Sequence, residues 1–269
     1  MTATTAIIGR AATAPVSAEP SLRSEQVTQL VLGETGRVLE QRDEWRRVRL
    51  AGDHYEGWIH RGYLIEADVE AVEDWRRRAS AWSEGAVVEV AATHSTPAVR
   101  LKLPVRARLE LRDGKVVLPD GRHASILAGQ IIPHARLIMR LSAEPLWRSA
   151  VVIFAGTPYQ WGGVTPWGVD CSGMVQTVCL AGGIHLSRDA RVQATEGVPV
   201  EPGTEAVDDL LFFTESAEQI THVAIAGPDE SLVHSTVACG GFVREPSQPG
   251  SRAFALWQRQ VVRRRLARR

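Results

Sequence analysis

Residues 157–174 read Thr-Pro-Tyr-Gln-Trp-Gly-Gly-Val-Thr-Pro-Trp-Gly-Val-Asp-Cys-Ser-Gly-Met, a loop rich in glycine and proline that leads to a cysteine. Apolar residues then recur at helical spacing as far as the glycine pair at 182–183, which predicts a helix that starts at Cys171 with Asp170 as its N-cap. Unpaired N–H groups and the positive end of the dipole at a helix start lower a thiol's pKa. A lone cysteine is more often a buried structural residue, an interpretation that suits Cys179 in the apolar stripe. We expect Cys171, which follows an exposed type of loop, to be a nucleophile.

The composition is that of an ordinary globular protein. The 269 residues suffice for two or three domains, and 44% are hydrophobic and 23% charged. The formal net charge is zero, so no nucleic-acid partner is indicated, and the arginines at 263–265 and 268–269 are interpreted as a solvated tail rather than an anion-binding patch. Three cysteines argue against a disulfide framework and fit a reducing compartment.

No membrane partner is expected from the sequence. No segment reaches the length of a spanning helix, and the first ten residues lack the basic start and long apolar core of a secretory signal. We therefore expect a cytoplasmic protein, although the sequence leaves export open. It does not indicate an oligomeric state.

Four segments are predicted along the chain. Residues 1–66 comprise a loosely held arm, 1 to about 20, and a small barrel of short strands interrupted by glycines. Residues 67–81 carry acidic residues first and basic residues later, which favours a connecting helix. Residues 82–140 contain more short β-type runs and predict a second small barrel.

Residues 141–269 predict an α+β domain. A helix is expected from Ala143 to Gly156, with Trp147, Val151 and Phe154 facing inward, before the cysteine helix. Strands are expected at 209–213, 221–226, 231–237 and 254–261. The fold class is thus α+β, with a nucleophile-bearing helix backed by an antiparallel sheet.

Two histidines are candidates for the base that a catalytic thiol needs. His222 lies in an alternating strand pattern and His234 follows twelve residues later, beyond a turn at Gly227-Pro228-Asp229. A hairpin centred on Pro228 places the two histidines opposite each other on one face, with Cβ atoms roughly 5 Å apart. We interpret His222 as the base and His234 as the residue that orients it, although either histidine alone could be an ordinary strand residue.

A metal site is the alternative interpretation of this constellation. Cys171, His222 and His234 are all possible zinc ligands, but no closely spaced ligand pair on one element supports such a site. We expect no metal and no organic cofactor. The remaining histidines are interpreted as surface or packing residues: His54, His60, His94, His123, His134 and His185.

Several motifs in order resemble the NlpC family of bacterial cell-wall cysteine peptidases. They are Tyr159-x-Trp-Gly-Gly, Asp170-Cys-Ser-Gly, Ser187-Arg with Gln193, His222-Val and His234-Ser. This resemblance implies a papain-like catalytic domain. The segments with Trp45-Arg-Arg-Val-Arg-Leu and Tyr55-Glu-Gly-Trp-Ile resemble bacterial SH3-like domains, and the second barrel is expected to be a degenerate copy. The pair of barrels resembles the subgroup that cleaves free murein peptides between γ-D-glutamate and a diamino acid, next to an unblocked L-alanine.

The resemblance also implies roles for individual residues. Cys171 is the nucleophile, His222 the base and His234 the third polar residue. Tyr159 assists substrate placement or oxyanion binding, and the backbone N–H of Cys171 is the expected oxyanion donor.

The remaining implied roles concern the substrate. Asp170, Ser172, Ser187 and Arg188 resemble the group that holds the D-glutamyl residue, with Arg188 as a partner for its α-carboxylate. In the first barrel, Tyr55 and Glu25 are the candidates to receive the free amino group of L-alanine. Glu56 and Glu19 are rivals for the carboxylate, and packing on the barrel is the alternative role of Tyr55.

The resemblance thus implies a cysteine endopeptidase that acts on L-Ala-γ-D-Glu-diamino acid peptides, and the thiol chemistry implies a thioester intermediate. The sequence does not distinguish diaminopimelate from lysine as the third residue, nor recycling from an extracellular role. Two alternatives remain open: a non-catalytic cell-wall-binding protein, and a thiol amidase or acyltransferase of the same fold.

Overall fold

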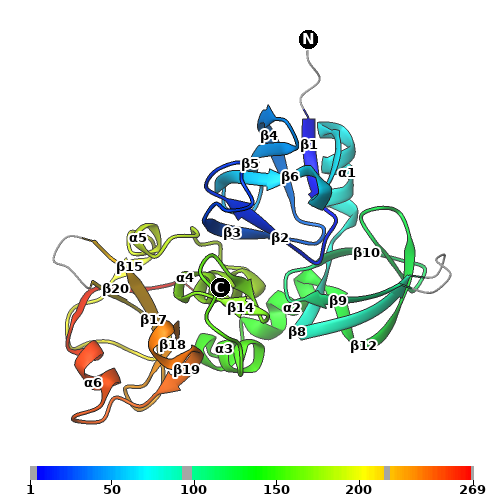
Figure 1. Cartoon of the computed structure of the whole chain (residues 1–269). Coiled ribbons are helices and arrows are strands. Elements are labelled where there is room, and N and C mark those ends of the chain that lie inside the picture. The colour runs from blue at the N-terminus through cyan, green and yellow to red at the C-terminus, as the bar shows by residue number, and fades with distance from the viewer. Residues whose placement is uncertain (1–4, 93–98, 215–218, 268–269) are drawn as a thin grey trace. The chain divides into compact units, whose positions relative to one another are not determined.

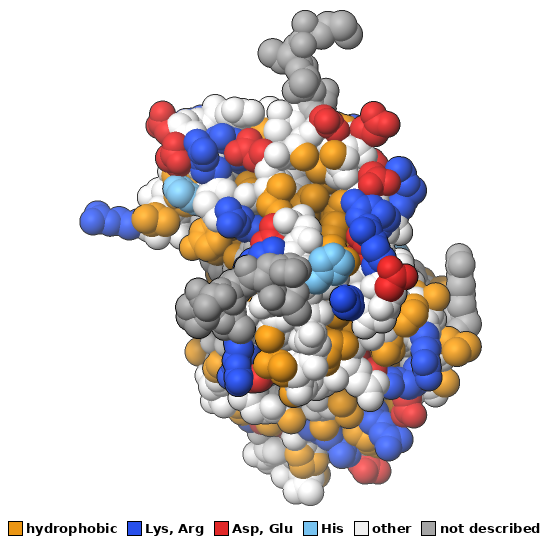
Figure 2. All heavy atoms as spheres, turned by 90° about the vertical axis from the view of Figure 1, so that its right-hand side faces the viewer, with side chains coloured by type: hydrophobic (Ala, Val, Ile, Leu, Met, Phe, Trp, Pro, Cys, Tyr) orange, Lys and Arg blue, Asp and Glu red, His pale blue; other side chains and the backbone are white. Residues whose placement is uncertain are grey.

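The computed structural model describes residues 5–92, 99–214 and 219–267. The chain divides into two compact units, residues 1–137 and 138–269, whose elements are labelled in Figure 1. Within the described ranges, none of the helices has the length and apolar character that crossing a membrane requires. Basic and acidic side chains are intermixed on the face displayed in Figure 2, in keeping with the zero formal charge.

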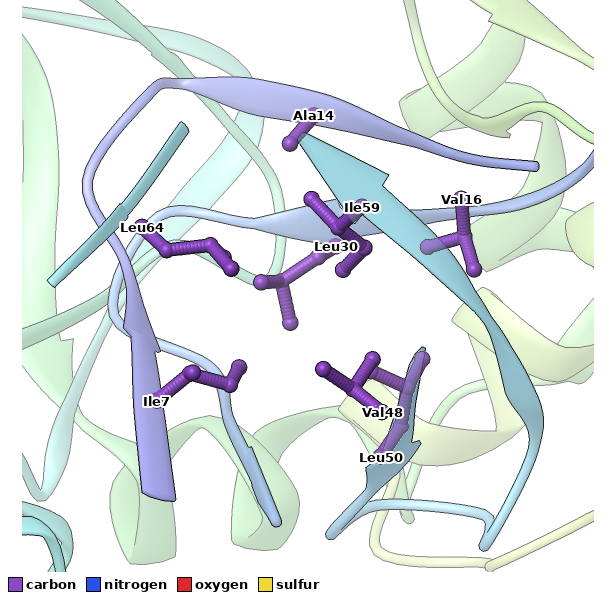
Figure 3. Packing of buried hydrophobic residues seen from close by; sticks show 8 residues of the cluster. All are labelled: Ile7, Ala14, Val16, Leu30, Val48, Leu50, Ile59 and Leu64. Carbon is purple, nitrogen blue, oxygen red and sulfur yellow. The ribbon is translucent and has the colours of Figure 1, made fainter. Parts of the chain in front are cut away.

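The first unit opens with a seven-stranded antiparallel sheet in the order β3-β2-β6-β5-β4-β1-β7. Its elements are β1 (Thr5–Gly9), β2 (Thr13–Ser17), β3 (Gln26–Val31), β4 (Thr35–Arg42), β5 (Trp45–Leu50), β6 (Glu56–His60), the 3-10 turn η1 (Arg61–Tyr63) and β7 (Leu64–Asp68). Figure 3 shows eight apolar side chains from these strands converging on one another to form the core of the predicted first barrel.

The predicted loose arm at residues 1–20 is wrong for the described part, which forms strands β1 and β2. Strand β1 pairs with both β4 and β7, and β2 pairs with β3 and β6. Ile7 packs into the barrel core, whereas Ala6 and Ile8 pack on the opposite side against helix α1 (Val69–Arg78). A strand buried on both faces lacks the alternation of polar and apolar residues by which strands are recognised.

Helix α1 falls within the predicted connecting segment 67–81. Asp68 caps it by accepting a hydrogen bond from Ala71 N at 2.8 Å, and basic residues occupy its last turn. Trp75 is buried and its Nε1 donates to the carbonyl of Gly33 at 2.9 Å, which fixes the helix on the β3–β4 turn.

A five-stranded sheet follows, in the order β10-β11-β12-β8-β9 with an additional β10–β8 pairing. Its strands are β8 (Ala81–Ala92), β9 (Arg100–Pro104), β10 (Arg108–Arg112), β11 (Lys115–Val117) and β12 (His123–Pro133). Short β-type runs were expected here, whereas the interpretation as a copy of the first barrel stays a prediction. Helix α2 (His134–Leu141) begins at the end of β12 and was not predicted.

The second unit packs helices against a six-stranded sheet in the order β15-β20-β16-β17-β18-β19. Its elements are α3 (Leu146–Phe154), β13 (Val164–Thr165), β14 (Gly168–Val169), α4 (Cys171–Ala181), α5 (Ala190–Gln193), β15 (Val198–Pro199), β16 (Leu210–Phe213), β17 (His222–Ala226), β18 (Leu232–Thr236), the 3-10 turn η2 (Val237–Cys239), β19 (Gly241–Glu245), α6 (Arg252–Trp257) and β20 (Gln260–Arg265). The described residues of this unit thus have the predicted α+β layout.

The first helix of this unit starts later than predicted, because Pro145 stands at its N-cap. Its buried face is formed by Leu146, Ala150, Ile153 and Phe154, so only Phe154 of the three residues expected to face inward is fully buried.

The C-terminal end of the chain also differs from the prediction. A strand was predicted at 254–261, but residues 254–257 belong to helix α6 and strand β20 begins only at Gln260. Ser251 caps α6 by accepting a hydrogen bond from Phe254 N. The arginines at 263–265 belong to β20 rather than to a solvated tail. Arg263 pairs with Glu205 at 2.5 Å and Arg265 pairs with Asp209 at 2.7 Å.

Candidate active site

Helix α4 begins at Cys171, as predicted, because Asp170 satisfies backbone donors on both sides of it. Oδ1 of Asp170 accepts from Gly173 N at 2.7 Å, and Oδ2 accepts from Gly162 N at 2.9 Å. The carboxylate therefore joins the glycine-rich loop to the first helical turn. A Cβ at Gly173 would collide with the carbonyl oxygen of Gly163, which explains the glycine after Asp-Cys-Ser.

A buried ion pair supports this helix start. Arg188 places Nη1 3.1 Å from Oδ1 and Nη2 2.5 Å from Oδ2 of Asp170, and Nη1 also donates to Ser172 Oγ at 2.8 Å. The Arg188 and Asp170 side chains are only 2% and 7% exposed. In the resting site the Arg188 guanidinium is thus engaged by Asp170 and Ser172. Its predicted contact with substrate stays a prediction.

The thiol of Cys171 is in its neutral form in the resting site, contrary to the depressed pKa expected at a helix start. Burial, followed by the negative charge of Asp170, raises the pKa of Cys171 to about 12, although backbone N–H groups of Val223 and Ser172 hydrogen-bond to the sulfur and lower it. The Cys171 residue is 6% exposed. Loss of hydration thus outweighs the helix start, and formation of the thiolate requires a base.

The hairpin that carries the histidines has a register two residues away from the predicted one. The observed partners are Ile225–Val233 and Ala226–Leu232, which places Ala224 opposite His234 and makes His222 its diagonal neighbour. The reason is a wider turn in which Gly227 N donates to Ser231 O and residues 229 and 230 have positive φ. A shift of two residues preserves the face, so both rings still lie on the same side.

The two imidazoles are in direct contact. His222 Nε2 lies 2.7 Å from His234 Nδ1, and the rings meet edge to face with centroids 4.9 Å apart. His234 Nε2 in turn lies 2.9 Å from Oε2 of Glu245 on the neighbouring strand β19, and this carboxylate forms an ion pair with Arg252 at the start of α6. Burial is the largest cause that lowers the pKa of His222 to about 3, and repulsion between the two rings when both are protonated and the charge of Arg252 lower it further. His222 is therefore a neutral imidazole able to accept a proton.

Strand β17 connects the two parts of the site. Its pairs with β18 lie next to the turn, and the N–H of Val223, further along the strand, hydrogen-bonds to the Cys171 sulfur instead. The sulfur is thus bound by the residue that immediately follows His222. The predicted nucleophile and predicted base are brought together by one strand and one helix start.

Other predicted residues lie around this centre. Tyr159 is half-buried, and burial, then the nearby Cys171 and Asp170, raise its pKa. Ser187 donates from Oγ to Glu196 at 2.6 Å. Gln193 Nε2 donates to the carbonyls of Ser172 and Ser187, which ties the Ser187 loop to α4.

The residues predicted to bind the L-alanine amino group belong to the first unit. Tyr55 is half-buried and packs on the barrel core, and its backbone N–H bonds to Asp53. The Glu25 carbonyl accepts from Ala18 N. The rival Glu56 is paired with Arg47 and Arg49. The roles of Tyr55 and Glu25 in binding stay predictions.

The described part of the chain contains no group of three or more His, Cys, Asp or Glu side chains arranged to hold a metal ion. Of the histidines outside the site, His60 caps η1 and His134 stacks on Trp82 with ring centroids 3.8 Å apart. His94 lies outside the described residues.

Two residues of the site were missed by sequence reasoning, Glu245 and Arg252. The signal that could have found Glu245 is the short alternating run after the glycines at 240–241, which forms β19 beside β18. Arg252 was missed because no helix was predicted at 252–257.

Comparison with known proteins places this geometry in a family. Residues 156–258 match the model of the NlpC/P60 family, and residues 16–64 match that of the bacterial dipeptidyl-peptidase Sh3 domain. The probable endopeptidase NlpC of Escherichia coli is 32% identical over 110 residues, which cover 40% of this chain and 71% of that protein. The chain therefore belongs to the NlpC/P60 family of peptidoglycan peptidases and carries a bacterial SH3 domain.

Two other similarities extend over parts of both units. The gamma-D-glutamyl-L-lysine dipeptidyl-peptidase of Bacillus cereus is 25% identical over 222 residues, which cover 77% of this chain and 66% of that protein. The crystal structure of an NlpC/P60 family protein from Bacillus cereus matches with a TM-score of 0.78 at 21% identity, and covers 97% of this chain and 99% of that one. The latter likeness concerns the fold.

Proposed function

We propose that this protein is a cysteine endopeptidase that hydrolyses the bond between γ-D-glutamate and a diamino acid in murein peptides with a free N-terminal L-alanine. The observation that carries the proposal is the thiol of Cys171, which is bound by the N–H next to His222, itself paired with His234. The Bacillus cereus relative is named a gamma-D-glutamyl-L-lysine dipeptidyl-peptidase, and this name supports the choice of bond.

Acylation begins with proton transfer from Cys171 to His222. The S–H bond breaks, an N–H bond forms on the imidazole, and the thiolate attacks the γ-carbonyl carbon of the glutamyl residue. The C=O π electrons move to the oxygen, where backbone N–H groups at the start of α4 stabilise the negative charge. Collapse of this intermediate breaks the C–N bond, and the imidazolium gives its proton to the leaving amine.

Deacylation uses the same groups with water. His222 removes a proton from water, the resulting hydroxide adds to the thioester carbonyl, and the C–S bond breaks. The imidazolium returns its proton to the sulfur and restores the neutral pair. A neutral thiol beside a neutral imidazole is the resting state that the raised pKa of Cys171 and the lowered pKa of His222 dictate.

Substrate contacts are assigned from the surroundings of the thiol. Tyr159, half-buried beside Cys171, is proposed to position the scissile group, and Ser187 to contact the glutamyl residue. Asp170, Ser172 and Arg188 hold the loop and helix start against which that residue would lie. Tyr55 and Glu25 are proposed to receive the L-alanine ammonium.

Incubation with free L-Ala-γ-D-Glu-L-Lys, its diaminopimelate counterpart and the N-acetylated peptides tests the proposal, with products identified by mass spectrometry. We expect release of L-Ala-D-Glu from the free peptides and little from the acetylated ones. Cys171→Ala should reduce turnover by at least about a thousandfold, because no other group can form the thioester.

The matched control is Cys179→Ala, since Cys179 is fully buried within the same helix and has no proposed role in the reaction. It should retain turnover. Cleavage by Cys171→Ala, or binding of intact peptidoglycan with no turnover of any free peptide, would contradict the proposal.

A further inference from the structure

Glu245 stands behind the two histidines in a continuous chain of hydrogen bonds. The chain runs from His222 Nε2 to His234 Nδ1 over 2.7 Å, and from His234 Nε2 to Glu245 Oε2 over 2.9 Å. The His234 side chain is 0% exposed, whereas the Glu245 side chain at the end of the chain of hydrogen bonds is 18% exposed. The three residues come from adjacent strands, β17, β18 and β19, of one sheet.

The carboxylate decides where the protons of both rings lie. An ionised carboxylate only accepts hydrogen bonds, so His234 must carry its proton on Nε2. Nδ1 of a neutral His234 then holds a lone pair and accepts from His222, whose proton must be on Nε2. The remaining nitrogen of His222, Nδ1, is thus left unprotonated. The direction of these hydrogen bonds, from His222 through His234 to Glu245, thus leaves Nδ1 as the nitrogen of His222 that can act as the base.

The carboxylate is itself held in its ionised form. The hydrogen bond from His234 is the largest cause that lowers the pKa of Glu245, and the guanidinium of Arg252 lowers it further. Arg252 also lies 3.2 Å from the sulfur of Cys239. Both partners of Glu245 therefore favour the negative charge that the hydrogen-bond chain needs.

We propose that Glu245 is a positioning residue that acts through His234 to fix the tautomer of His222 and to stabilise its imidazolium during the reaction. The inference rests on the proposed thiol chemistry of the site. When the thiol proton reaches His222, a positive charge appears in a buried place, and a carboxylate at the end of the chain offsets it. The other charged or titratable groups that bear on this charge are His234 from β18 and Arg252 from α6.

The test compares Glu245→Gln, Glu245→Asp and Glu245→Ala with the matched control Glu230→Gln, which changes an exposed glutamate in the turn between β17 and β18. For each, kcat and KM are measured on the free peptide. The rate of alkylation of Cys171 by iodoacetamide at pH 7 is followed by peptide mass spectrometry, which separates it from Cys179 and Cys239. Thermal midpoints report on folding.

We expect kcat of Glu245→Gln to fall by about 10- to 100-fold with KM unchanged, because the amide keeps the shape but loses the charge. Alkylation of Cys171 should slow by a similar factor, and Glu245→Asp should recover part of both losses. The thermal midpoint of Glu245→Gln should stay within a few degrees of the parent.

Equal kcat and equal alkylation rates for Glu245→Gln and Glu230→Gln would overturn the inference. So would a rise in KM alone, or an activity loss in every Glu245 variant that merely follows a fall in the thermal midpoint. Because alkylation needs no peptide, it still tests Glu245 if the parent protein cleaves none of the peptides, a result that would count only against the proposed substrate.

Discussion

Two polar networks meet at Cys171, and they are built from different kinds of groups. On the helix side, Asp170 and Arg188 form a buried pair of opposite fixed charges. On the sheet side, His222 and His234 are joined ring to ring and end on Glu245. The first network has its charges compensated at rest, whereas the second can accept a proton.

The difference shows that positioning of the thiol and transfer of its proton depend on different side chains. The Asp170–Arg188 pair is engaged within itself and with backbone N–H groups of Gly162 and Gly173, so it holds the loop and the helix start in place. Imidazoles titrate near neutrality unless their surroundings shift them, and here the surroundings keep His222 neutral. Position and proton transfer are therefore assigned to separate sets of side chains.

The largest effect is expected from breaking the helix-side network. Arg188→Met leaves the Asp170 carboxylate buried without its counter-charge, which should lower the free energy of unfolding by roughly 3–5 kcal/mol. Urea denaturation measures this, and Arg191→Met, which changes an exposed arginine of the neighbouring helix α5, is the control. A loss no larger than that of the control would mean that the pair does not hold the helix start.

The next largest effect is the pH dependence of the free energy of unfolding, to which His222 and Cys171 contribute in opposite directions. His222 has a folded pKa of about 3 against an ordinary 6.5, so only the unfolded chain gains its proton as the pH falls between these values. Stability should therefore fall on acidification below 6.5, by up to about 1.4 kcal/mol per pH unit from this one group. Cys171 has the opposite effect, because its folded pKa of about 12 lies above the ordinary value of 9.0. The stability that its neutral thiol contributes to the folded state is therefore lost as the pH rises from 9 towards 12.

Denaturation midpoints measured across the pH range follow both the acidic limb, where stability falls below pH 6.5, and the alkaline limb, where it falls above pH 9. His222→Gln should flatten the acidic limb and Cys171→Ala the alkaline limb, while Arg191→Met should change neither. An acidic limb that is as steep in His222→Gln as in the parent would show that other groups, rather than this imidazole, set the pH dependence.

The smallest effect is expected from Ser172, which belongs to the helix-side network but carries no charge. Its hydroxyl donates to Asp170 at 3.3 Å and accepts from Arg188 at 2.8 Å. Ser172→Ala should lower the free energy of unfolding by about 1 kcal/mol, with kcat preserved. A large fall in kcat would instead assign this hydroxyl to the proton-transfer network.

The sequence was sufficient for the parts of the site that depend on local patterns. A glycine- and proline-rich loop, an acidic N-cap and helical spacing predicted the start of α4 at Cys171. The face shared by His222 and His234 was predicted because side chains alternate along a strand. Their register was not, since it depends on positive φ angles at Asp229 and Glu230 that no sequence signal near Pro228 revealed.

Contacts between residues far apart in the sequence could not be predicted from local patterns. Glu245 contacts His234 from the neighbouring strand β19, which was not among the predicted strands. The Asp170–Arg188 pair joins residues eighteen apart, whose partnership depends on the packing of a loop on α4. The thiol pKa was predicted in the wrong direction because local sequence shows the helix dipole but not the burial that outweighs it.

The first strand has a consequence for work on the isolated amino-terminal domain. The matched family region starts at residue 16, but β1 lies between β4 and β7 and fills one side of the barrel. A fragment expressed from residue 16 would lack β1 and most of β2, which leaves edges of β3, β4 and β7 without a neighbour and removes Ile7 and Ala14 from the apolar interior. Bare edges of this kind favour pairing between molecules, so the shortened domain should precipitate, whereas one that begins upstream of Thr5 should remain monodisperse.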